Sequence, residues 1–298
     1  MTLFYSDLYT IPLPEGHRFP MEKYRLLREA LTERGLFTEE EIRPAVPATE
    51  EQLLLAHTPA YVRSILDGTA APAVMRRIGF PWSPALARRS MMTVGGALGA
   101  ADEALRSGVS ANLAGGTHHA MRNEGEGFCV FNDQAVTALR LLSGGRVRRV
   151  AVVDLDVHQG NGTAEILGGR DDVFILSMHG AKNFPFRKVP STLDVELADG
   201  TGDGEYLSAL ASALPLVFAF RPDIVLYQMG VDVLKEDALG RLHLSLDGIA
   251  AREQMVYGAC RRHGVPVSVA LGGGYAKPIA HTIEAQLRSF AVLRSVFG

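Results

Sequence analysis

The sequence predicts an α/β fold, a single domain built on an open parallel sheet that is flanked by helices. The chain has 298 residues, of which 47% are hydrophobic, so it is long enough to bury one large core. Five short apolar runs, most of them rich in Val and Ile, lack polar alternation and so fit strands covered on both faces. Helical segments separate these runs to the end of the chain, without a linker, repeat or low-complexity segment. We therefore predict one domain over residues 1–298.

The apolar runs give five predicted strands, over residues 111–114, 150–153, 173–176, 224–227 and 267–271. The first helix, residues 21–34, carries apolar residues such as Leu27 and Leu31 at helical spacing. The second, residues 85–106, is rich in Ala, and the third, residues 133–142, follows a suitable N-cap in Asn132. The remaining helices are predicted over residues 204–220, 246–263 and 278–296.

Composition and charge exclude several classes of protein. The net charge is -3, and the arginines are scattered in ones and twos, so binding of nucleic acid through charge alone is not expected. No apolar run reaches the length of a membrane span, and the N-terminus lacks the pattern of a signal peptide. Two cysteines, Cys129 and Cys260, cannot form a disulfide framework. These features predict a cytoplasmic protein.

Polar residues and glycines gather directly after the predicted strands. One such segment follows each strand in turn, at residues 115–119, 154–162, 179, 230–237 and 272–275. In open α/β sheets, ligands bind beyond the carboxyl ends of the strands. The sequence therefore predicts a single site at that edge of the sheet.

The segment after the second strand carries the pattern of a metal site. Alternate side chains of an extended chain share a face, so Asp154, Asp156 and His158 can point together. Asp156 and His158 would offer one oxygen and one nitrogen, and Asp232 a second carboxylate; three protein ligands with an open position are typical of a catalytic metal site. Taken alone, the two strand-end carboxylates have another interpretation, because they also suit the cap of the next helix.

Two further segments point to acid–base chemistry at the same edge. His118 and His119 follow a Gly-Gly turn, and imidazoles suit general acid–base catalysis, although a pair of surface histidines is an equal alternative. Gly273 lies in a run of three glycines that precedes Tyr275, where the backbone can turn tightly. The Tyr275 hydroxyl could then stabilise an oxyanion. The alternative is a flexible turn with a packed tyrosine.

Aromatic residues near these segments suit a channel for an aliphatic chain. Phe128, which follows Gly127, and the pair Phe184 and Phe186 are the candidates, and core packing is the alternative for the pair. Cys129 is expected to be a small buried residue rather than a reactive thiol.

Together these residues resemble a known family. The segments GGTHHA, GFCVFND, VVDLDVHQGNG, GVDVLKEDALG and LGGGY look like the signature segments of histone deacetylases and their bacterial relatives, in the same order. AHTPAYV (residues 56–62) resembles another segment of that family, so the likeness runs from about His17 to the C-terminus. HQGNG, DGTGDGEYL and VDVLKEDALGRLHLS are most similar to the class IV branch.

The resemblance implies the arginase–deacetylase fold and a zinc-dependent amidohydrolase that removes acyl groups from lysine in proteins. It implies Zn²⁺, with Fe²⁺ as an alternative, bound by Asp156, His158 and Asp232. K⁺ as a structural ion is a further family feature, expected near Asp154 and Ser177, and also near Asp156, His158 and Met178.

The resemblance also implies roles for the other site residues. His119 is the implied general base toward water and His118 its companion at the leaving amine, with Asp154 and Asn161 as the partners of His118 and His119 in turn. Tyr275 polarises the acyl carbonyl. For the substrate, the implied contacts are Gly127, Phe128, Phe184 and Gly273.

Two departures from the family pattern alter these expectations. Many members carry Asp at the position of Asn161, and a neutral amide cannot stabilise an imidazolium as a carboxylate does. We therefore predict that His119 is less basic than His118. The segment RRIGFPWSP contains no acidic residue where class I enzymes have an Asp that holds the peptide backbone, so a longer acyl chain or a small amine stays open as substrate.

Three alternatives remain for the function. A two-metal ureohydrolase is disfavoured because Gly160 and Leu234 occupy positions where added ligands would stand. A deacylase of small acylated amines such as acetylpolyamines would use the same catalytic residues; acidic rim residues would mark it, with Glu124, Glu126, Glu236 and Asp237 as candidates. A binding protein without activity would lack Tyr275 or one of the two histidines; all are present, so this alternative is disfavoured. The oligomeric state and partner proteins cannot be predicted.

Overall fold

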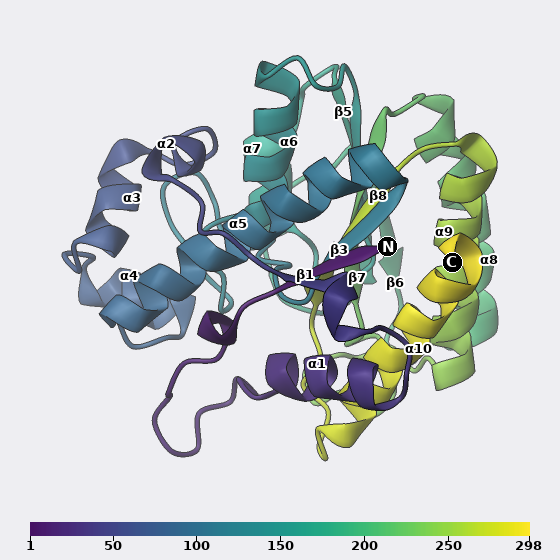
Figure 1. The fold of residues 1–298 in the computed structure, drawn as a ribbon, viewed down its shortest axis with the longest axis horizontal. Coiled ribbons are helices and arrows are strands. Elements are labelled where there is room, and N and C mark those ends of the chain that lie inside the picture. Colours follow the sequence, from purple (N-terminus) through teal and green to yellow (C-terminus); the bar gives the residue numbers. More distant parts are fainter.

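The computed structural model describes all 298 residues, and its centre is one sheet of eight parallel strands (Figure 1). The strand order is β2-β1-β3-β8-β7-β4-β5-β6. In chain order the strands are β1 (Thr2–Tyr5), β2 (Ile42–Pro44), β3 (Val109–Asn112), β4 (Val150–Asp154), β5 (Val173–Gly180), β6 (Leu193–Leu197), β7 (Ile224–Gly230) and β8 (Val267–Gly272). The predicted class, an open parallel sheet flanked by helices, is confirmed.

Three of the eight strands were not predicted, so the expectation of five was wrong. β1, β2 and β6 lie at or next to the edges of the sheet. They are three to five residues long, and most residues of β2 and β6 are only partly buried or exposed. The edge strands β2 and β6 need no continuous apolar run, and the mostly buried β1 has only four residues, so the pattern that marks the central strands is missing or too short in them. The first predicted strand, residues 111–114, corresponds to β3, which starts and ends two residues earlier. The prediction extended too far because Leu113 and Ala114, which follow β3, are also apolar and buried.

Helices cover both faces of the sheet. They are α1 (Lys23–Glu33), α2 (Glu50–Leu53), α3 (Pro59–Leu66), α4 (Pro72–Ile78), α5 (Pro84–Ser107), α6 (Asp133–Ser143), α7 (Asn161–Leu167), α8 (Asp203–Ala219), α9 (Leu246–His263) and α10 (Ala280–Phe297). In Figure 1, α8, α9 and α10 lie together on one side of the sheet, and α5 and α6 on the other. Four of these, α2, α3, α4 and α7, were not predicted; each has eight residues or fewer, too short to show a helical period. No helix is both apolar and long enough to span a membrane.

Local sequence fixes the ends of the helices that support the site. The predicted cap of α6 is confirmed, because the Asn132 side chain accepts a hydrogen bond from the Ala135 N–H at 2.9 Å. The long helix α5 is capped at its N-terminus by Ser83, whose hydroxyl accepts from the Leu86 N–H, and at its C-terminus by Gly108 in the left-handed conformation.

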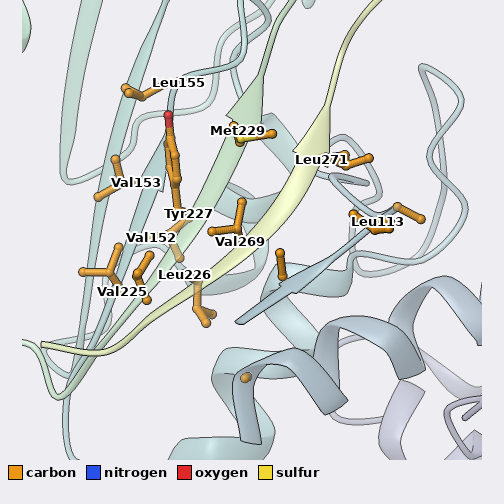
Figure 2. Packing of buried hydrophobic residues seen from close by; sticks show 14 of the residues in the cluster. Leu113, Val152, Val153, Leu155, Val225, Leu226, Tyr227, Met229, Val269 and Leu271 are labelled. Carbon is orange, nitrogen blue, oxygen red and sulfur yellow. The ribbon is translucent and has the colours of Figure 1, made fainter. Parts of the chain in front are cut away.

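Aliphatic side chains of the central strands lie in the core between the layers, together with apolar side chains of the helices. Val152 of β4, Val225 of β7 and Val269 of β8 belong to one buried cluster (Figure 2). Because all strands run parallel, the carboxyl ends of β3, β4, β5, β7 and β8 meet at one edge. Four of the five polar segments predicted to converge there line one cavity, whereas His179 lies within β5 and lines neither that cavity nor the one outside it.

Candidate active site

Two carboxylates and one imidazole converge at the carboxyl edge of the sheet. Asp156 and His158 follow β4, and Asp232 follows β7. Their ligand atoms lie within 4.8 Å of one another, and His158 Nδ1 is 3.0 Å from Asp156 Oδ1 and 3.1 Å from Asp232 Oδ2. All three side chains are largely buried. Two oxygens and one nitrogen aimed at a common point fit a single divalent cation.

Backbone groups hold the two carboxylates in this arrangement. The Val157 N–H donates to Asp232 Oδ1 at 2.9 Å, and the His158 N–H donates to Asp156 Oδ1 at 3.0 Å. Gly273, at a φ of +52°, leaves the space that Asp232 occupies, since a Cβ there would lie 2.1 Å from its carboxylate. Gly273 was expected at the substrate; its position behind Asp232 shows that it also makes room for a candidate metal ligand.

The adjacent histidines have different partners. His118 Nδ1 lies 2.7 Å from Asp154 Oδ2, and His119 Nδ1 lies 2.7 Å from Asn161 Oδ1. Burial lowers the pKa of His118, but the charges of Asp154 and Asp156 outweigh it and raise that pKa to about 9. Burial holds the pKa of His119 well below its usual value, and the charges of His118 and His158 lower it further. These directions agree with the prediction that His119 is the less basic of the two.

Glu126 fixes the proton position on His119, a role that the sequence did not indicate. Its carboxylate accepts a hydrogen bond from Asn161 Nδ2 at 2.6 Å, so the amide must turn its Oδ1 toward His119. An amide oxygen only accepts, which places the proton on His119 Nδ1 and leaves the lone pair on Nε2.

Residues 17–289 match the family model of the histone deacetylase domain. The chain belongs to the histone deacetylase family. It is 43% identical to an uncharacterized protein of Picosynechococcus, over 92% of each chain. It is 31% identical to histone deacetylase 2 of Arabidopsis thaliana, over 98% of this chain and 79% of that one. It is also 31% identical to a histone deacetylase-like amidohydrolase of Pseudomonas aeruginosa, over 89% of this chain and 74% of that one.

The fold is shared with a solved histone deacetylase structure, the HDA15 HD domain. The TM-score is 0.81 at 24% identity, over 100% of this chain and 91% of the other. The arginase–deacetylase fold is therefore confirmed.

In this histone deacetylase family member, the three candidate ligands line an inner cavity that two buried cations also line. Lys23 and Arg89 line it together with Tyr24. The Lys23 ammonium donates to the Gly273 carbonyl, and burial lowers the pKa of Lys23 to about 8 against the charges of Asp232 and Asp237. Arg89 Nη2 donates to the Tyr24 hydroxyl at 3.1 Å. The burial of these two cations was not predicted, because each lies within a predicted helix, where a lysine or arginine is usually exposed to solvent.

Tyr275 lies between the inner cavity and an outer cavity of about 480 Å³ that opens at the surface. Its N–H donates to Asp237 Oδ2 at 2.6 Å, which fixes the backbone. Gly127, Phe128 and Phe184 line the outer cavity, and the centroid of the Phe184 ring lies 4.9 Å from that of His119. Phe128 is a non-glycine residue at a φ of +65°, which costs about 1 kcal/mol or more and is tolerated mainly at functional sites.

The remaining expected residues are found as follows. Phe186 is exposed beside the outer cavity, so core packing is excluded for it. Cys129 is buried, and burial raises the pKa of its thiol, as expected for an unreactive cysteine. Asp154 pairs with Ser177 in the register of β4 and β5, so two of the residues expected near K⁺ are neighbours. The ion itself stays a prediction.

Proposed function

We propose that this protein is a metal-dependent hydrolase that removes acetyl or longer acyl groups from the side-chain amine of lysine in proteins. We further propose that residues 1–298 form one catalytic domain. The observation that carries the proposal is the convergence of Asp156, His158 and Asp232 beside His119 and Tyr275. Family membership supports the hydrolase chemistry.

The three ligands would hold one Zn²⁺, with Fe²⁺ as the alternative. When bound, such a metal supplies a Lewis acid that polarises the amide carbonyl and acidifies water. The low pKa of His119 keeps Nε2 unprotonated and able to take the proton of the attacking water. Tyr275 would donate from its hydroxyl to the carbonyl oxygen as negative charge develops there.

The histidine pair would divide the proton transfers. His118, with a pKa of about 9 beside Asp154, holds a proton at neutral pH. The water oxygen would first form the new bond to the carbonyl carbon, and the proton of His118 would then pass to the amine nitrogen as the C–N bond breaks. The products are a free amine and a carboxylate. Gly127, Phe128 and Phe184 would line the path of the acyl-lysine chain.

Removal of metal tests this proposal directly. Dialysis against a chelator is expected to abolish release of amine from fluorogenic lysine substrates, acetyl through myristoyl, and one equivalent of Zn²⁺ or Fe²⁺ is expected to restore it. The preferred chain length measures the depth of the channel. If the reloaded protein leaves the whole series intact but hydrolyses acetylated polyamines, the small-amine alternative replaces the proposal. If no metal binds, the ligand assignment is wrong.

The pairing of His119 with Asn161 predicts a pH effect. The base must be neutral, so kcat/KM falls at low pH as His119 takes up a proton. In the double variant Asn161→Asp/Glu126→Gln, the new carboxylate raises the pKa of His119, and the amide introduced at position 126 can donate a hydrogen bond to that carboxylate. We expect the acidic limb to move up by about one pH unit. Glu126→Gln alone is the control and should not move it upward; an unchanged limb in the double variant would contradict the assignment of His119 as base.

A further inference from the structure

Four cations surround the opening of the active site, and we call them the basic mouth: Arg18, Arg77, Lys182 and Arg241. All four line the outer cavity, and each has an exposed side chain; the exposed fraction is 74% for Lys182 and 52% for Arg77 and Arg241. They come from four separate parts of the chain. The whole chain has a net charge of -3, so this concentration of positive charge is local.

The acidic residues near the opening are already engaged. Glu126, the only acid that lines the outer cavity, accepts a hydrogen bond from Asn161. Glu124 pairs with Arg77 at 2.6 Å. Asp237 is buried and accepts the backbone N–H groups of Leu239, Gly240 and Tyr275. Glu236 lies in a different pocket. Glu124, Glu126 and Asp237 are thus engaged and Glu236 lies away from the opening, so none of the four is placed to receive a cationic substrate there.

The cations, in contrast, are only partly neutralised. Lys182, at 4.0 Å, and Arg241, at 3.3 Å, share Asp199 as their ion-pair partner. Arg18 has no ion-pair partner. Four cations therefore face three carboxylates, namely Glu124, Glu126 and Asp199, of which Glu126 is directed inward. The mouth keeps a surplus of positive charge, with at least one unpaired guanidinium.

An exposed aromatic ring lies within the same surface. Phe186 is 86% exposed, and its ring is 6.2 Å from that of Phe184 in the channel wall. An apolar ring in a cavity that cations also line suits a peptide segment that combines an apolar residue with acidic ones.

We propose that the basic mouth selects acyl-lysine peptides whose neighbouring residues are acidic, and that it disfavours cationic acylated amines such as acetylpolyamines. This inference rests on the proposed function for the identity of the scissile group. It follows from charge complementarity, since exposed cations raise the local concentration of an anionic segment and repel a cationic one.

Binding tests the inference separately from turnover. Two fluorescent acetyl-lysine peptides that differ only in Asp or Lys on both sides of the acetyl-lysine are titrated with the Zn²⁺-loaded Tyr275→Phe variant and followed by anisotropy. We expect the Asp peptide to bind about tenfold more tightly in 0.05 M NaCl, and the difference to shrink in 0.5 M NaCl because exposed charges are screened.

Matched charge reversals locate the effect. Arg18→Glu/Lys182→Glu should abolish or invert the preference. Arg148→Glu/Arg261→Glu changes the net charge equally but lies at the amino edge of the sheet, next to β4 and in the last turn of α9, and should retain the preference. Turnover of a neutral peptide by the wild-type protein tests the proposed function itself. A binding preference without turnover would contradict that function but would still support the inference about binding.

Two outcomes would overturn the inference. One is tighter binding of the Lys peptide or of an acetylpolyamine. The other is equal binding of the two peptides; if the protein then sediments with phosphatidylglycerol vesicles, the basic mouth binds a lipid surface instead.

Discussion

Tyr275→Phe is expected to lower kcat for an acyl-lysine substrate by about 100- to 1000-fold, with little change in KM or metal content. The substitution removes one hydroxyl from a ring that lies between the inner and outer cavities. Burial keeps the pKa of Tyr275 well above its usual value, so the hydroxyl stays protonated and can donate throughout the working pH range. A donor that acts only as charge develops on the carbonyl oxygen contributes to kcat rather than to binding.

A second tyrosine provides a matched control for this prediction. Tyr257 is fully buried on α9, and its hydroxyl donates only to the sulfur of Met229, at 3.3 Å. Tyr257→Phe removes the same atom away from both cavities and should leave kcat within about twofold of the wild type, since the interaction is weak. The measurement is kcat for amine release by both variants, with metal content determined in parallel. A Tyr275→Phe variant with nearly full kcat would remove this residue from the chemistry.

The sequence predicted the centre of the fold because burial on both faces leaves a visible pattern. β4, β7 and β8 are buried along their whole length and consist mainly of apolar residues, and their parallel arrangement brings Asp156 and Asp232 together although 76 positions separate them. The expected metal ligands followed from that convergence. β2 and β6 have no such pattern, because an edge strand can be short and partly exposed.

Contacts between side chains from distant segments could not be predicted in this way. The hydrogen bond from Asn161 to Glu126 depends on how the start of α7 packs against the segment that carries Glu126, and Glu126 was considered only as a possible rim acid. The basic mouth is a second case. Its cations are scattered along the chain, which suggested no charged surface, and only folding gathers Arg18, Arg77, Lys182 and Arg241 around one opening.

Arg252 is the clearest example of a residue whose importance only the structure reveals. The sequence places it in a helix, where arginine is usually exposed, yet its side chain is fully buried. It pairs with the equally buried Glu253, which accepts further hydrogen bonds from Tyr227 at 2.6 Å and Ser289 at 3.1 Å. Burial opposes the charge of Arg252, but Glu253 outweighs it and raises the pKa of the guanidinium.

Loss of Arg252 should therefore destabilise the fold more than most single substitutions. Arg252→Met leaves the Glu253 carboxylate buried without its cation, and we expect the free energy of unfolding to fall by about 3–5 kcal/mol. Arg252→Met/Glu253→Gln removes the unpaired charge while keeping an acceptor for Tyr227 and Ser289, so it should recover part of the loss. Urea unfolding followed by circular dichroism measures both. Equal stability of wild type and Arg252→Met would show that the pair contributes nothing net.

The same guanidinium connects stability to the site. Arg252 Nη1 donates to the Gly230 carbonyl at 2.6 Å and to the Leu155 carbonyl at 3.3 Å. Leu155 directly precedes Asp156, and Gly230 lies two residues before Asp232, so one side chain holds the backbone of both segments that supply carboxylates. Arg252→Met should therefore also weaken Zn²⁺ binding by about 10- to 100-fold, the usual effect of losing support behind metal ligands, measured by competition with a chelating dye below the unfolding transition. A destabilised variant with unchanged metal affinity would restrict Arg252 to the core.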